Sequence, residues 1–188
     1  MTLQATPPRF SPEEFDRAHD DWGANCGPGA IAAICGLTLD ELRPHLGDFE
    51  RKRYTNPTLM FGILRRLYDL GVVSRRSFPN EVAPQYGLVR VQWHGPWMRA
   101  GVPIAARYRH THWIGVAHRP GENGAGDTGV FDINALGNGT GWVRKADWLG
   151  IIVPAILQHC VPGADGGLSY THAIEIEQMA QPKQAVAV

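Results

Sequence analysis

Apolar residues with helical spacing dominate the first third of the chain, between short polar turns. The segment Ser11 to Glu14 has the order of a capping box with proline in the first turn, which predicts a helix to about His19. The run Gly29 to Cys35 is apolar throughout and stops at Gly36, as expected of a buried helix. Thr38 opens a third, short helix.

A longer helix is expected after Asn56-Pro57. Its apolar positions lie three or four residues apart and form one stripe: Met60, Ile63, Leu64, Leu67 and Leu70. The stripe ends before Gly71. The pattern therefore predicts a helical lobe over residues 11–71.

From Val72 onward the pattern changes to short β-rich runs between glycine and proline turns. The predicted strands are Leu88 to Trp93, Val102 to Tyr108, His112 to His118, Val130 to Asn134 and Ile151 to Leu157. Helices followed by strands are typical of an α+β domain with segregated layers. We therefore predict one domain over residues 1–177, with an antiparallel sheet lobe over 72–177 and a flexible tail at 178–188.

The composition limits the classes of function. The 188-residue chain has 18 Lys and Arg against 18 Asp and Glu, so its net charge of zero favours neither nucleic acid nor a membrane as partner. The first twenty residues lack the charged-then-apolar order of a secretion signal, and no apolar stretch approaches about 18 residues. We expect a cytoplasmic protein, and no pattern indicates its oligomeric state.

Three cysteines stand in the chain, and none has the CxxC spacing of a zinc site. Cys35 and Cys160 are expected to be ordinary small apolar side chains. Cys26 differs because it precedes Gly27-Pro28 at the start of the predicted buried helix. The free N–H groups at a helix N-terminus stabilise a thiolate, which is the nucleophilic form of cysteine. A glycine-proline turn with an incidental cysteine is the competing interpretation.

Three blocks of the sequence occur in an order typical of one enzyme superfamily. They are Asn25-Cys26-Gly27-Pro28-Gly29-Ala30-Ile31-Ala32-Ala33, His112-Trp113-Ile114-Gly115-Val116 and Val130-Phe131-Asp132-Ile133-Asn134. These blocks resemble the cysteine, histidine and aspartate or asparagine blocks of papain-like cysteine peptidases, most closely the bacterial bacteriocin-leader (double-glycine leader) peptidase-like branch. The resemblance implies a papain-like fold, in which the helix that carries Cys26 packs on an antiparallel sheet or half-barrel.

The resemblance also implies roles for single residues. Cys26 would attack a carbonyl carbon, His112 would transfer the proton and Asp132 would orient the imidazole. The expected reaction is hydrolysis of a peptide, isopeptide or amide bond in a peptide or protein substrate through an acyl-enzyme, with no cofactor and no metal.

Two histidines compete for the role of base. In a strand from Val102 to His118, the even positions include His110 and His112 and face inward, because Arg107 and Arg109 occupy the odd face. His112 is favoured because it directly precedes the most apolar part of the run and fits the histidine block of the resembled family. His110 remains the alternate.

The residue that holds the second imidazole nitrogen is open between Asp132 and Asn134, which share a face of the next predicted strand. A hairpin that pairs His112 with Asp132 turns at residue 122, and one that pairs it with Asn134 turns at residue 123. The predicted connection, Arg119 to Thr128, slightly favours Asn134. We favour Asp132 because the leader-peptidase-like branch usually has aspartate here.

One position departs from the papain-like pattern. These enzymes generally carry a glutamine about six residues before the cysteine, where this chain has Asp20, whose carboxylate cannot donate a hydrogen bond. The backbone N–H of Cys26 can still stabilise an oxyanion, with Asn25 or the Trp22 indole as the second donor. Loss of one such donor costs about 10² to 10³ in rate, so an altered or inactive enzyme also fits the sequence.

Three other functions fit parts of the sequence. An acyl transferase of the transglutaminase-like type would keep the triad and use an amine in place of water. An inactive papain-like module would use the cleft to bind a protein segment, which Asp20 favours. A metal site of His110, His112 and Asp132 has a real ligand spacing but leaves Cys26 unexplained.

Charge and aromatic clusters add two weaker expectations. The segments Arg51-Lys52-Arg53 and Arg75-Arg76 are expected to be solvated. Five tryptophans are expected to pack in the core of the sheet half, with one or two as walls of a groove: Trp93, Trp97, Trp113, Trp142 and Trp148.

Overall fold

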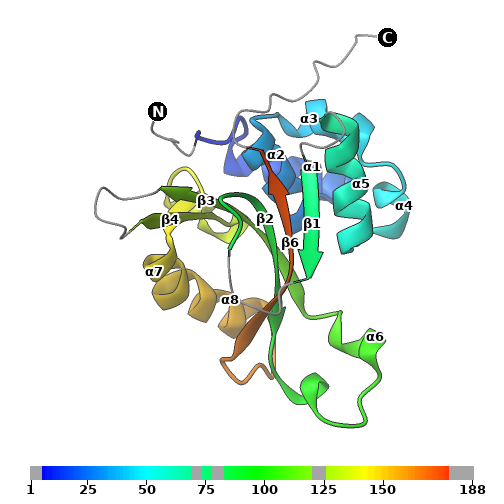
Figure 1. The fold of residues 1–188 in the computed structure, drawn as a ribbon, viewed down its shortest axis with the longest axis vertical. Helices are drawn as coiled ribbons and strands as arrows, with labels where there is room; N and C mark the ends of the chain where they lie inside the picture. Colours follow the sequence, from blue (N-terminus) through cyan, green and yellow to red (C-terminus); the bar gives the residue numbers. More distant parts are fainter. Residues whose placement is uncertain (1–5, 69–72, 78–82, 120–125, 178–188) are drawn as a thin grey trace.

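The fold is a mixture of helices and one six-stranded antiparallel sheet, as Figure 1 shows for this computed structural model. The structure describes residues 6–68, 73–77, 83–119 and 126–177. The predicted α+β class is confirmed. The tail predicted at 178–188 and the predicted boundary between the lobes, at 71–72, lie outside the described residues. Within the described part of the chain, no helix is long and apolar enough to cross a membrane.

The first lobe is helical, as its hydrophobic pattern predicts. Its elements are α1 (Pro12–Trp22), α2 (Cys26–Cys35), α3 (Leu39–Leu42), the 3₁₀ helix η1 (Arg43–His45), α4 (Phe49–Lys52) and α5 (Pro57–Leu67). Side-chain caps set the starts of the longer helices: Ser11 caps α1, Asn25 caps α2 and Asn56 caps α5. The cap at Asn25 starts α2 at Cys26, three residues before the apolar run.

The sheet does not follow chain order. Its strands are β1 (Val73–Ser77), β2 (Tyr86–Trp93), β3 (Thr111–Arg119), β4 (Asp127–Phe131), β5 (Trp142–Arg144) and β6 (Leu168–Ile176). They are arranged in the order β1-β6-β2-β3-β4-β5, and every neighbouring pair is antiparallel. The last strand of the chain therefore lies between β1 and β2 (Figure 1).

Each face of the sheet has its own hydrophobic core. On one face, Leu88, Trp113 and Ile174 are buried against the helical lobe. On the other face, Val89 and Ile114 belong to a separate cluster with residues of the C-terminal helices. Alternate residues of β2 and β3 thus enter different cores, as the period of two along a strand requires.

A glycine lets α2 lie close to the sheet. A Cβ atom at Gly115 in β3 would stand 2.7 Å from Ile34 Cγ2 of α2 and 3.1 Å from Phe131 Cβ. Only a residue without a side chain allows this approach, because real Cβ contacts are not that short. The distance between α2 and β3 is therefore fixed by close packing.

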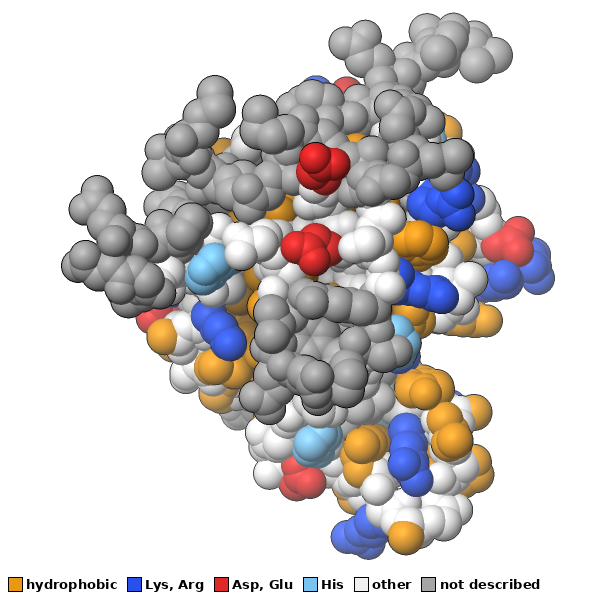
Figure 2. Space-filling view, viewed as in Figure 1, with side chains coloured by type: hydrophobic (Ala, Val, Ile, Leu, Met, Phe, Trp, Pro, Cys, Tyr) orange, Lys and Arg blue, Asp and Glu red, His pale blue; other side chains and the backbone are white. Residues whose placement is uncertain are grey.

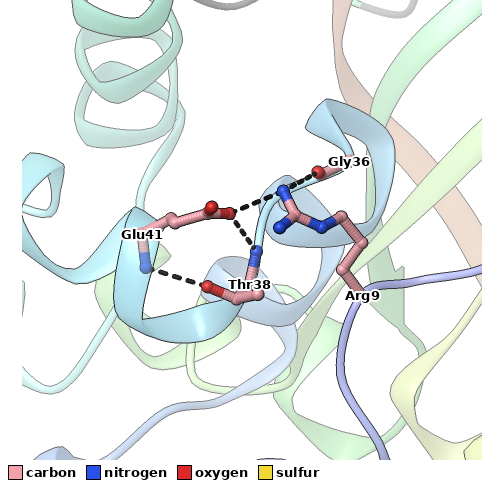
Figure 3. A network of polar contacts seen from close by, with 4 residues as sticks. All are labelled: Arg9, Gly36, Thr38 and Glu41. Atoms are coloured by element: carbon pink, nitrogen blue, oxygen red, sulfur yellow. Dashed lines mark hydrogen bonds and ion pairs between the residues drawn. The ribbon is translucent and has the colours of Figure 1, made fainter. Parts of the chain in front are cut away.

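A polar network anchors the end of α2 that lies away from Cys26 (Figure 3). Arg9 Nη1 donates to the carbonyl oxygen of Gly36 at 3.2 Å and to Glu41 Oε2 at 2.9 Å. Glu41 in turn forms a capping box with Thr38 at the start of α3. The N-terminal segment, the end of α2 and the start of α3 are thereby connected.

The predicted strand Val102 to Tyr108 is wrong. This segment contains a short helix, α6 (Ile104–Arg107), which follows the 3₁₀ helix η2 (Pro96–Met98). Pro103 stands directly before α6 with φ −56°, and the alanines that follow it favour a helix over a strand. Ile104 is exposed, so no core holds the segment in an extended form.

The predicted strand Ile151 to Leu157 is also wrong. The chain forms α7 (Lys145–Asp147), the π-helix η4 (Trp148–Ile152) and α8 (Val153–Cys160) in succession. The buried side chains are Trp148, Ile152, Val153 and Ile156. Their spacing of about four residues is helical, and proline in the first turn of α8 suits a helix but not a sheet.

Candidate active site

Cys26 is the first residue of α2 and is half-buried. The first turn leaves its backbone N–H open. Asn25 Oδ1 accepts from the N–H of Gly27 at 3.1 Å, Pro28 has no N–H, and Gly29 donates to the carbonyl oxygen of Asn25 at 3.0 Å. Among the described residues, no acceptor is found for the N–H of Cys26. A free backbone donor therefore lies next to the thiol.

Two glycines allow the start of α2 to enter a crowded place. A Cβ at Gly27 would stand 2.5 Å from Thr55 Cγ2, and a Cβ at Gly29 would stand 2.5 Å from Ile133 Cγ2. The helix start is thus held between the loop before α5 and the residue that follows Asp132. This packing brings Cys26 to the open edge between the helical lobe and the sheet.

His112 lies on β3 with 7% of its surface exposed. Its Nε2 is 2.9 Å from Asp132 Oδ2, and its ring stacks on Trp93 at a centroid distance of 5.9 Å. The Cys26 side chain is close enough to His112 to raise the pKa of its imidazole. Because Nε2 is bound to Asp132, Nδ1 is the ring nitrogen left for Cys26.

The charge on His112 depends on its two partners. Burial lowers the pKa of His112, but the Asp132 carboxylate and Cys26 outweigh burial and raise that pKa well above its ordinary value. The imidazolium form is therefore favoured at neutral pH.

Asp132 is completely buried and accepts four hydrogen bonds. Oδ2 accepts from His112 and from Trp148 Nε1 at 2.8 Å, while Oδ1 accepts from the backbone N–H and from Nδ2 of Asn134, both at 2.9 Å. Burial opposes ionisation, but His112 and these hydrogen bonds lower the pKa of Asp132 to about 2. The carboxylate is therefore charged at neutral pH.

The structure brings Asp132, not Asn134, to His112. The β3–β4 register pairs Gly115 with Phe131, and a strand that continued would place Asn134 opposite His112. The strand ends at Phe131 instead. The predicted strand Val130 to Asn134 therefore lies three residues too late, because β4 ends at Phe131 and Asp132 caps the 3₁₀ helix η3 (Ile133–Asn138).

His110 and the proposed metal site do not share this arrangement. The His110 ring stacks on Trp97 at 3.7 Å, and burial together with Arg109 lowers the pKa of His110. Over the described ranges, no group of three His, Cys, Asp or Glu side chains is placed to hold a metal ion. The metal interpretation of His110, His112 and Asp132 is therefore abandoned.

Of the candidate oxyanion donors, only some lie at the cavity that contains Cys26. Asp20 is exposed on α1, and Trp22 is buried edge-on against Phe49 and lines a separate cavity. Cys26 and Asn25 line one common cavity. Trp113, predicted only as a core or groove residue, lines the same cavity, and its buried Nε1 has no hydrogen-bond partner in the described part of the chain.

The cavity beside Cys26 has a volume of about 1000 Å³. It lies between the loop before α5, the segment that contains α6 and the sheet, where Figure 2 shows a notch with Lys or Arg side chains on its upper side. Among the described residues, four arginines line it, Arg53, Arg75, Arg90 and Arg109, and no Asp or Glu does. Arg53 and Arg75, expected only to be solvated, therefore contribute to the wall of a cavity.

The other two cysteines differ from Cys26. Cys35 is buried, and burial raises the pKa of its thiol to about 12, although a hydrogen bond with Tyr68 opposes the change. Cys160 is exposed on α8. All three cysteines are free.

Two residues at the site were not predicted from the sequence: Arg90, which lines the cavity, and Trp148, which donates to Asp132. Arg90 stands in the middle of the apolar run of β2. Because charged side chains are seldom buried without a partner, an arginine in such a run indicates a function other than packing. No comparable signal marks Trp148, because its hydrogen bond to Asp132 depends on the helix η4, which the sequence did not predict.

Comparison with protein-family models, with curated protein sequences and with solved structures gives no match to this chain. The chemistry of the site is therefore inferred from its own residues.

Proposed function

We propose that the protein is a cysteine-dependent hydrolase that cleaves a peptide, isopeptide or amide bond through an acyl-enzyme on Cys26. The observation that carries this proposal is the chain of contacts from Cys26 to His112 and from His112 to Asp132. A nucleophile, a base and a buried acceptor that orients the base are the three parts that this chemistry needs.

The first half of the reaction forms a thioester. The Cys26 thiolate attacks the carbonyl carbon of the substrate, and the carbonyl oxygen becomes an oxyanion. His112, as imidazolium, then donates its Nδ1 proton to the leaving amine, and the C–N bond breaks. Asp132 keeps the imidazole in the required orientation through Nε2.

The second half releases the product. A water molecule attacks the thioester carbonyl, and neutral His112 accepts its proton. The C–S bond then breaks, which frees the carboxylic acid and restores the Cys26 thiolate and the His112 imidazolium.

Oxyanion stabilisation comes from donors other than residue 20. The open N–H of Cys26 is one, and it lies at the N-terminus of α2, where the helix dipole favours negative charge. Asn25 Nδ2 and the unpartnered Nε1 of Trp113 line the same cavity as further donors. The exposed Asp20 has no part in this arrangement.

A papain-like layout is part of the proposal. It is supported by a nucleophile at the start of a buried helix, a base on the adjoining antiparallel sheet and an orienting carboxylate on the next strand end. The three free cysteines agree with a reducing location, and we therefore propose the cytoplasm.

Brief treatment with iodoacetamide at neutral pH tests whether Cys26 is activated. We expect Cys26 to be alkylated faster than Cys160, although Cys160 is the more exposed, and Cys35 to stay unmodified in the folded protein. Peptide mapping by mass spectrometry gives the rate at each site. Labelling of Cys26 at or below the rate of Cys160 would contradict an activated nucleophile.

Catalysis itself is tested with an electrophilic activity probe and a peptide library, on wild type beside Cys26→Ala. We expect the wild type to react with the probe and to cleave part of the library, and Cys26→Ala to do neither. Identical behaviour of the two proteins would leave the hydrolase proposal without support and would favour a module that only binds peptides.

A further inference from the structure

We propose that the cavity beside Cys26 contains an anion subsite, and that the substrate of the hydrolase carries a carboxylate that binds to Arg90. This inference rests on the proposed function for the identity of the ligand as a peptide. The subsite itself rests on separate observations, which concern Arg90 and its neighbours.

Arg90 is a buried cation with few partners. It lies on β2 with 4% of its surface exposed and lines the cavity that contains Cys26. Its Nη2 donates to Thr111 Oγ1 at 3.3 Å, and its guanidinium stands 4.8 Å from the ring centre of Tyr108. Its buried Nε has no hydrogen-bond partner among the residues that the structure describes. Within the described part of the chain, no carboxylate forms an ion pair with it.

A guanidinium in this position needs an anion. Burial of an unpaired charge is costly, and burial lowers the pKa of Arg90 accordingly. One hydroxyl and one aromatic ring do not neutralise a positive charge. A carboxylate would do so, because its two oxygens match the planar fork of the guanidinium.

The neighbours of Arg90 make the same face of the sheet positive. Arg90 is paired in register with His172 of β6, and Arg75 lies on β1, two register positions from His172. Both arginines act on His172, since burial and then the charges of Arg90 and Arg75 lower its pKa. The Nδ1 atom of His172 is buried and also lacks a hydrogen-bond partner within the described ranges.

The rest of the cavity wall does not compensate this charge. Arg53 and Arg109 add positive charge, and the described carboxylates form no ion pair with either side chain. A cavity lined by one sign of charge concentrates ligands of the opposite sign. The cavity is thus suited to an acidic segment of a peptide, although the whole protein has no net charge.

The subsite lies close to the nucleophile. Arg90 and Cys26 line the same cavity and are near enough for their charges to interact. A carboxylate on Arg90 therefore belongs to the same bound peptide segment as the bond that Cys26 attacks. Its source is either an acidic side chain or the C-terminal carboxylate of the peptide.

Binding to Cys26→Ala tests the subsite without any need for turnover. The probes are N-acetylated peptide pools with one fixed position, either Glu or its neutral isostere Gln, each with a C-terminal carboxylate or amide. We expect the Glu or the free-carboxylate pools to bind at least about tenfold more tightly than their neutral counterparts, and the advantage to shrink as salt is raised. The four pools separate the side-chain source from the C-terminal source.

Substitution of Arg90 tests whether this side chain causes the preference for acidic pools. Arg90→Gln should remove the preference for the acidic pools, whereas Arg51→Gln, which changes the same charge on the exposed α4 helix outside the cavity, should keep it. If circular dichroism shows that Arg90→Gln does not fold, Arg109→Gln and Arg75→Gln replace it, and each should reduce the preference about two- to fivefold through the loss of positive potential.

The possible failures are distinct. Equal binding of acidic and neutral pools, no binding of any pool, or an unchanged preference in Arg90→Gln would overturn the anion subsite. Cleavage by wild type without any preference for acidic pools would also overturn it while the hydrolase proposal stands. Tight, Arg90-dependent binding without cleavage by wild type would support the subsite and contradict the hydrolase.

Discussion

Asp132 does two things with one carboxylate. Through Oδ1 it caps η3 by accepting from Asn134, and through Oδ2 it holds the imidazole of His112 and the indole of Trp148. The turn that ends β4 and the orientation of the proposed base are therefore fixed by the same side chain. Asn134 acts on Asp132 and not on His112.

Alanine substitutions at Asp132 and at Asn134 should have unequal effects on activity. Asp132→Ala should lower kcat/KM by about 10² to 10⁴, because the imidazole loses its acceptor. Asn134→Ala should cost less than about tenfold, because its backbone N–H still donates to Asp132. The measurement is kcat/KM on a peptide found in the library screen, with circular dichroism as the control for folding. A greater loss in Asn134→Ala would move the orienting role to that residue.

Which of Asp132 and Asn134 contacts His112 could not be predicted from sequence spacing. The hairpin register centres on residue 123, in agreement with the sequence spacing that slightly favoured Asn134. That spacing applies only while both strands continue. The chain leaves the sheet after Phe131, and one capping hydrogen bond then decides which side chain reaches His112.

At the scale of elements, the contact between α2 and β3 controls the distance from Cys26 to His112. Cys26 and Ile34 lie on one rigid helix, and His112 and Gly115 lie on one strand. Close packing at Gly115 therefore fixes the placement of the proposed nucleophile beside its base.

Gly115→Ala should disturb this contact. The added methyl group would stand 2.7 Å from Ile34 Cγ2, so we expect a loss of about 1 to 3 kcal/mol in the free energy of unfolding and a lower kcat. Gly62→Ala is the matched control, because a Cβ there meets only Arg66 Nη1 at 3.8 Å and should stabilise α5 by about 0.5 to 1 kcal/mol. Urea unfolding measures both changes. If both variants changed the free energy of unfolding in the same direction, the α2–β3 contact would not be tight.

The elements differ in how well their sequences predict them. Helices with caps and a one-sided apolar stripe, such as α1 and α5, are found from sequence because local signals determine both their ends and their buried face. The two missed helical segments, at α6 and at η4 with α8, contain β-branched and apolar residues whose local preference is ambiguous. A proline in each was the signal for a helix.

At the scale of the whole molecule, the buried pair of His112 and Asp132 links stability to pH. The pKa of Asp132 is lowered to about 2, so its contribution is present above its ordinary pKa of 3.8 and is lost as pH falls toward 2. The pKa of His112 is raised, so its contribution is complete below 6.5 and is lost as pH rises through the raised value. The pair therefore stabilises the fold most between about pH 4 and 6.5.

Denaturant unfolding of wild type and Asp132→Asn across this range tests that linkage. We expect the wild type to be more stable by about 2 kcal/mol near pH 6, with the difference declining toward pH 2 and toward alkaline pH. Cys26→Ala, which leaves the pair in place, should keep most of the wild-type profile. A difference between wild type and Asp132→Asn that does not change with pH would exclude an ion pair.

The position of β6 has a consequence for biosynthesis. β1 and β2 make no ladder with each other and are joined only when β6 inserts between them. On the ribosome, the strands β1 to β5 emerge before residue 168. Until β6 follows, no strand joins Arg75 on β1 to Arg90 on β2. Since late, long-range strand pairing is a slow step of folding, the growing chain would assemble its cationic cavity last.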